Sequence, residues 1–88
     1  MNHTDVLTKA FAEVPADIRL QGKLSFGIAD RIADVLNQNG MTQKELARKM
    51  GKTEAEVSVW LSGQHNFTLR TLAKISIVLG VELIQISG

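Results

Sequence analysis

Residues 42–63 read TQKELARKMGKTEAEVSVWLSG, and this stretch decides the fold. Two of its threonines are each followed three residues later by a glutamate, in the pairs Thr42–Glu45 and Thr53–Glu56. This pattern is a capping box, in which each side chain satisfies a free backbone N–H of the other residue at a helix start. The stretch therefore predicts two short helices, one from residue 42 to about 50 and one over 54–62.

A glycine turn joins these two helices. Gly51 follows the first helix, and the second capping box opens almost at once. Two short helices joined by a turn of three or four residues that contains glycine form a helix-turn-helix unit. The sequence thus predicts such a unit at the centre of the chain.

The spacing within the unit has a mechanical reason at four positions. Ala47 faces the second helix where the two helices cross closely, so a larger side chain would push them apart. Gly51 supplies the positive φ that the turn needs. Val57 and Trp60 anchor the second helix in the core. The free face of that helix then holds Glu54, Ala55, Ser58, Val59 and Ser62.

Helical patterns flank the unit on both sides. Apolar residues at helical spacing predict a helix over about 28–39, ended by Asn39-Gly40, and another over 69–79, capped by Asn66 or Thr68. Shorter helical segments are expected over about 4–13 and, after Pro15, over 16–21. The β-branched residues 81–87 predict a short strand. The expected fold is an all-α bundle of about five helices with a short C-terminal strand.

Composition narrows the class of protein. The chain has 88 residues, a net charge of +1 and no cysteine, which favours one small domain without disulfides or thiolate metal ligands. Its richest apolar run, residues 75–86, is interrupted by polar residues and is too short to span a bilayer. The N-terminus lacks the pattern of a signal peptide. We therefore expect a soluble, cytoplasmic protein with no membrane partner.

Catalytic motifs are missing from the sequence. It has no glycine-rich phosphate loop, no nucleophile elbow and no recognisable pair of metal-binding histidines. We expect no enzyme activity, no cofactor, no metal site and no small-molecule substrate.

The helix-turn-helix stretch resembles the Cro/C1-repressor type, often called the XRE family, whose fold is lambda-repressor-like. The resemblance rests on residues 42–47, Gly51, 60–63 and 68–75, with Leu79-Gly80. The longer string from Leu24 to Thr68 is similar to antitoxins of HigA type. This resemblance implies an N-terminal helical extension at 1–22, a DNA-binding domain at 23–80 and a short strand or tail at 81–88.

The resemblance also implies a DNA interface. The second helix, 54–62, would lie in the major groove, and Gln43 would touch a phosphate and brace the groove-facing side. The loop 64–66 would approach the backbone of the other strand. The expected DNA-binding residues are Thr42, Gln43, Lys44, Lys52, Thr53, Glu54, Ala55, Ser58, Val59, Ser62, Gln64, His65 and Asn66.

Several of these side chains have two interpretations. His65 either touches a phosphate or closes a loop. The basic residues at 44, 48, 49 and 52 form either a phosphate-facing cluster or a solvated face, and we favour phosphate contact for Lys44 and Lys52. Glu56 is explained by its capping box, whereas Glu54 is awkward beside DNA unless it reads cytosine. Residues 44–74 carry a net charge of +3, which favours contact through phosphates more than through bases.

Two functions are compatible with these residues. The first is a sequence-specific transcriptional regulator that binds double-stranded DNA as a homodimer and represses its own toxin–antitoxin operon. The alternative is a protein-interaction module, such as a toxin neutraliser, with weak or no specific DNA binding. Residues 1–22 and the expected strand edge at 81–87 motivate this alternative.

Overall fold

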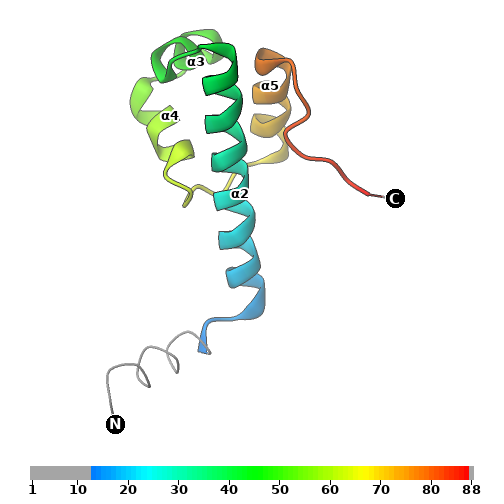
Figure 1. The fold of residues 1–88 in the computed structure, drawn as a ribbon. Helices are drawn as coiled ribbons and strands as arrows, with labels where there is room; N and C mark the ends of the chain where they lie inside the picture. Colours follow the sequence, from blue (N-terminus) through cyan, green and yellow to red (C-terminus); the bar gives the residue numbers. More distant parts are fainter. Residues whose placement is uncertain (1–12, 88) are drawn as a thin grey trace.

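The computed structural model describes residues 13–87 of the 88 and places four helices among them. These are α2 (Ala16–Asn39), α3 (Gln43–Met50), α4 (Glu54–Leu61) and α5 (Leu69–Leu79). In Figure 1, α2 is the central helix, with α3 and α4 on one side and α5 on the other. The N-terminal half of α2 projects beyond the other helices. The all-α bundle is confirmed.

Helix α2 is longer than the sequence predicted. The segments expected at 16–21 and 28–39 are parts of one helix of 24 residues that follows Pro15 and ends at Gly40, whose φ is 61°. Gly22 and Gly27 lie inside it, since a glycine weakens a helix by only about 1 kcal/mol and does not break it. The count of about five helices is therefore wrong for residues 13–87. The segment expected at 4–13 falls almost wholly outside the described residues, and the boundary expected between residues 22 and 23 lies within α2.

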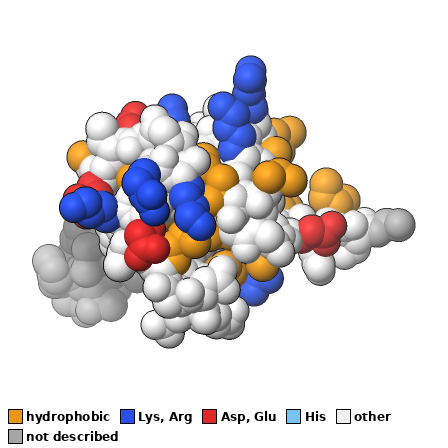
Figure 2. Space-filling model, turned by 90° about the horizontal axis from the view of Figure 1, so that it is seen from above, with side chains coloured by type: hydrophobic (Ala, Val, Ile, Leu, Met, Phe, Trp, Pro, Cys, Tyr) orange, Lys and Arg blue, Asp and Glu red, His pale blue; other side chains and the backbone are white. Residues whose placement is uncertain are grey.

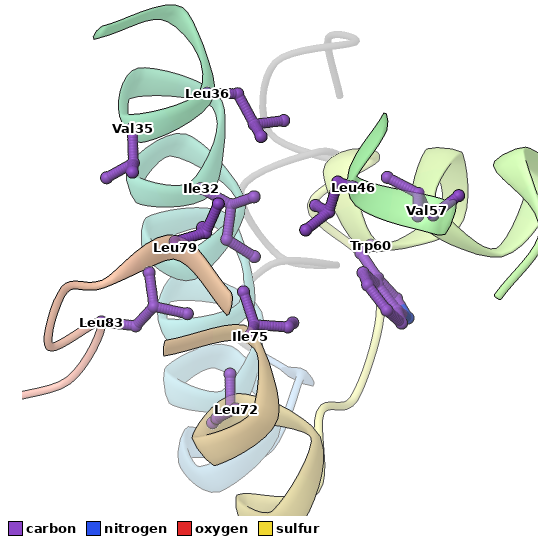
Figure 3. Close-up of a cluster of buried hydrophobic side chains, with 11 residues drawn as sticks. Ile32, Val35, Leu36, Leu46, Val57, Trp60, Leu72, Ile75, Leu79 and Leu83 are labelled. Atoms are coloured by element: carbon purple, nitrogen blue, oxygen red, sulfur yellow. The ribbon is translucent and has the colours of Figure 1, made fainter. Parts of the chain in front are cut away.

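The core lies where α2 meets the other three helices. Ile32, Leu46, Val57 and Ile75 are each 0% exposed, and they come from α2, α3, α4 and α5 respectively. Figure 3 shows these side chains meeting, with Trp60 closing the cluster on the side of α4. The predicted inward positions Ala47, Val57 and Trp60 are all buried. This core holds the two short helices, which would be unstable in isolation.

The C-terminal tail forms no strand within the described residues, so that prediction is wrong. The backbone N–H of Val81 donates to the carbonyl of Ser76, and that of Leu83 donates to the Ser76 hydroxyl. These bonds turn the chain back over α5 and bury Leu83 in the core. A strand needs a neighbouring strand to pair its backbone groups, and no strand occurs elsewhere among residues 13–87. Leu83 therefore packs in the core with Val81 against it, whereas Ile84 and Ile86 are exposed.

Candidate nucleic-acid interface

Both predicted capping boxes are present, and they fix where α3 and α4 begin. The Thr42 hydroxyl accepts from the Glu45 backbone N–H at 3.1 Å, and the Thr53 hydroxyl accepts from that of Glu56 at 3.1 Å. Each glutamate reaches back to the backbone N–H of its threonine. Gly51 sits between the helices with φ at 67°, in the left-handed region that favours glycine. The helix-turn-helix predicted from spacing is thus built by local hydrogen bonds.

Helix α4 presents the predicted free face to solvent. Val57 and Trp60 point into the core, and Leu61 is half-buried. The exposed side chains are those expected, Glu54, Ala55, Ser58, Val59 and, just after the helix, Ser62. Val59 is 51% exposed although it is apolar. An exposed strip of small and apolar side chains suits close contact with base edges in a groove.

A hydrogen bond connects the two helices on this exposed side. The Ser58 hydroxyl donates to Oε1 of Gln43 at 3.1 Å, across 15 residues of sequence. Because the Gln43 carbonyl oxygen is occupied, its Nε2 group keeps two N–H donors for another acceptor. A phosphate oxygen is an acceptor of this kind.

The two acidic residues of α4 lie in different surroundings. The carboxylate of Glu56 is held by the Thr53 backbone N–H at 2.7 Å, which lowers the pKa of Glu56, with a smaller lowering from nearby Lys52. This geometry agrees with the interpretation that the capping box explains Glu56. Glu54 lines a shallow surface depression together with Lys44, Arg48 and Lys52. The same depression includes Glu45, so three basic side chains share it with two carboxylates.

This depression also includes Arg48, one of the four basic residues for which the sequence left two interpretations open. Arg48 lies beside Lys44 and Lys52, and all three side chains are exposed. The spacing of four residues between Lys44 and Arg48 places both on one face of α3. Figure 2, which views the molecule from above, shows Lys and Arg side chains on the face seen there, with Asp and Glu side chains among them.

The loop after α4 is closed by its own side chains. The Ser62 hydroxyl donates to the Val59 carbonyl at 2.7 Å and accepts from the Gln64 backbone N–H at 3.2 Å. The His65 ring meets Phe67 edge-on, with centroids 4.8 Å apart. This contact supports the loop-closing interpretation of His65. Gln64 and Asn66 are exposed beside it, on the loop expected to approach the DNA backbone.

Searches of the described residues found no group of three or more histidine or acidic side chains that could hold a metal ion. In the same part of the chain, none of the helices combines the length and apolar character needed to cross a membrane.

Comparison with known proteins identifies the central region. A helix-turn-helix family model matches residues 32–86. Among solved structures, the chain is similar to crystal structures of HppE, one with cobalt(II) and one with iron(II), each in complex with substrate. Both are 33% identical over 67% of this chain, with TM-scores of 0.63 and 0.64. The chain spans about a third of the length of these proteins, 33% and 34% respectively. No curated protein matches the sequence.

Proposed function

We propose that the chain, which belongs to the XRE-type helix-turn-helix family, is a DNA-binding regulator that reads a specific operator as a repressor. The observation that carries the proposal is the exposed face of α4, joined to the start of α3 by the hydrogen bond from Ser58 to Gln43. This face is the part of the unit that enters the major groove.

The proposed contacts divide into two groups. Gln43 binds a phosphate through its free Nε2 donors, and Lys44 and Lys52 bind phosphates by charge. Ala55 and Val59 contact thymine methyl groups, since both are small, apolar and exposed on α4. Phosphate contacts carry most of the affinity in this assignment, and the apolar base contacts supply a modest discrimination.

The operator can be tested by fluorescence anisotropy with the DNA upstream of the chain's own coding sequence, over a range of salt concentrations. We expect the affinity to fall steeply with salt, because phosphate contacts release counterions. Lys44→Ala should weaken binding and reduce the salt slope by about one. Lys74→Ala is the matched control, because Lys74 is also exposed but lies on α5 outside the proposed contacts. Binding that is absent at low salt, or an equal change in both variants, would refute the assignment.

We further propose that two copies bind together. A single α4 reads only a few base pairs, and regulators of this kind place two such helices in half-sites about 34 Å apart. A DNA duplex with one half-site should bind much more weakly than the full operator. Light scattering should give the mass of two chains on the DNA, and a single chain there would contradict the proposal.

We propose more specifically that the chain acts as an antitoxin. It is supported by the similarity of residues 24–68 to antitoxins of HigA type. In this role the chain represses the operon that encodes it and neutralises the toxin made from the adjacent gene. Co-expression with the adjacent gene product tests this directly. We expect the two proteins to form a stable complex and the cells to grow again. Toxicity that persists when the chain is co-expressed would refute the role.

The protein-interaction module remains the second candidate. The carboxylates of Glu54 and Glu56 favour this candidate, because both lie beside the proposed DNA face and DNA phosphates would repel them. Complete loss of DNA binding together with a retained protein complex would select this function. We infer no nucleophilic role for Ser58 or Ser62, since their hydroxyls donate to Gln43 and to the Val59 carbonyl respectively.

A further inference from the structure

A groove between α3 and α5 lies outside the proposed DNA contacts. It has a volume of about 470 Å³ and shares none of its lining residues with the DNA-facing set. Its apolar part is formed by Met50, Ala73, Ile77 and Val78. Ile77 is 83% exposed, although it lies in the middle of the last turns of α5. An apolar surface rimmed by polar side chains marks an interaction site in a small soluble protein.

The rim of the groove is entirely basic. Lys49 lies at the end of α3, and Arg70 and Lys74 lie one turn apart on α5. Among residues 13–87, no acidic side chain lines the groove. Figure 2 shows exposed apolar side chains between basic ones at this end of the molecule. A partner that is complementary in charge must therefore carry carboxylates around an apolar centre.

We propose that this groove binds an acidic amphipathic helix of a partner protein. The apolar side chains of that helix would pack on Met50, Ile77 and Val78, and its carboxylates would pair with Lys49, Arg70 and Lys74. A helix laid in a groove uses anchors spaced at i, i+3, i+4 and i+7, and the open, elongated surface between two helices suits that geometry.

Other occupants fit the surface less well. A second copy of this chain, meeting the same face across a two-fold axis, would bring three cations against three cations. DNA would satisfy the cations but would leave the apolar part, including the side chain of Ile77, without a complementary surface. A small ligand needs enclosure over most of its surface, and a groove edged by a side chain as exposed as Ile77 does not enclose one.

The proposal can be tested with a synthetic helical peptide of about 16 residues, with leucine at the anchor positions and glutamate beside them. A peptide of the same composition in scrambled order is the control for charge alone. Binding to the full chain is followed by fluorescence anisotropy. We expect Ile77→Asp and Lys74→Glu each to weaken binding by about tenfold or more. Leu69→Asp is the matched control, because Leu69 is 82% exposed on the same helix but does not line the groove.

Further measurements keep the result decisive. Backbone amide shifts of the unsubstituted chain should change around Met50 and Ile77 on titration with the peptide, whether or not a variant folds. A peptide with lysine in place of glutamate should bind Lys74→Glu better than the unsubstituted chain.

Several outcomes would overturn the proposal. These are no binding up to 1 mM peptide, equal binding of the scrambled peptide, or an equal loss in Leu69→Asp. If Ile77→Asp lowers the affinity for DNA, the groove is a nucleic-acid surface. If Ile77→Asp lowers the molar mass of the protein in solution, the groove binds a second copy of the chain. Because the groove and the DNA face share no residues, this test and the operator test fail independently.

Discussion

Gly63 connects the end of α4 to the loop 64–66, and replacing it with alanine tests the packing beneath the proposed DNA face. Gly63 is buried and has a φ of 84°, a conformation that L-residues rarely adopt. A Cβ atom at this position would overlap the ring of Phe26, which comes from α2. The substitution is therefore unfavourable for two separate reasons, one in the backbone and one in the side-chain packing.

The magnitude follows from adding these two effects. The left-handed conformation costs an L-residue about 1–2 kcal/mol. The Phe26 ring is 54% exposed, so it can move aside, and displacing it from its rotamer costs about 0.5–1.5 kcal/mol. We expect Gly63→Ala to lower the free energy of unfolding by about 1.5–3.5 kcal/mol. That is a large share of the ~5–15 kcal/mol typical of a small domain.

The assay is urea unfolding followed by the fluorescence of Trp60, which is the only tryptophan and is buried. Gly40→Ala is the matched control, because Gly40 has a φ of 61° but open space around its Cβ position. It should lower the free energy of unfolding by about 1–2 kcal/mol, the backbone effect alone. In a Phe26→Ala background, Gly63→Ala should become cheaper by about 1 kcal/mol. If Gly63→Ala costs no more than Gly40→Ala, and Phe26→Ala changes nothing, the inferred packing of the ring on Gly63 is wrong.

Three further predictions concern the core, the caps and the helix pair. Ile75→Ala should lower the free energy of unfolding by about 2–5 kcal/mol in the same urea assay, because Ile75 is 0% exposed. The lowered pKa of Glu56 means that the unfolded chain binds this proton at a higher pH than the folded chain. The free energy of unfolding should therefore fall as the pH drops below about 4.3, the ordinary pKa of a glutamate. Glu56→Gln should make the free energy of unfolding less dependent on pH in curves measured between roughly pH 3 and 6. Ser58→Ala removes the hydrogen bond to Gln43 on an exposed surface. We expect DNA affinity to fall by about fivefold, equivalent to ~1 kcal/mol, with an unchanged urea midpoint, and a lowered midpoint would instead indicate a structural role.

Local patterns predicted the parts of the site that depend on neighbours in sequence. The capping boxes at Thr42 and Thr53 involve residues only three apart, and both formed as expected. The inward positions Val57 and Trp60 follow from helical spacing alone. The same reasoning located the exposed face of α4.

Contacts between distant residues were beyond such patterns. The bond from Ser58 to Gln43 spans 15 residues and depends on how α3 and α4 cross. The groove between α3 and α5 likewise exists only because the core brings Lys49 and Ile77 onto one surface.

The sequence by itself determined where α3 and α4 begin and where α3 and α5 end, since caps and left-handed glycines act within a few residues. For the start of α5 it left Asn66 and Thr68 as alternatives, and the structure shows Thr68 as the cap. It did not decide how far α2 extends, because Gly22 and Gly27 weaken a helix without ending it. Nor did it decide the form of residues 81–87, whose β-branched composition suits a strand equally well. Only the tertiary structure settled that question, because burying Leu83 against the helices needs no partner strand, whereas a strand does.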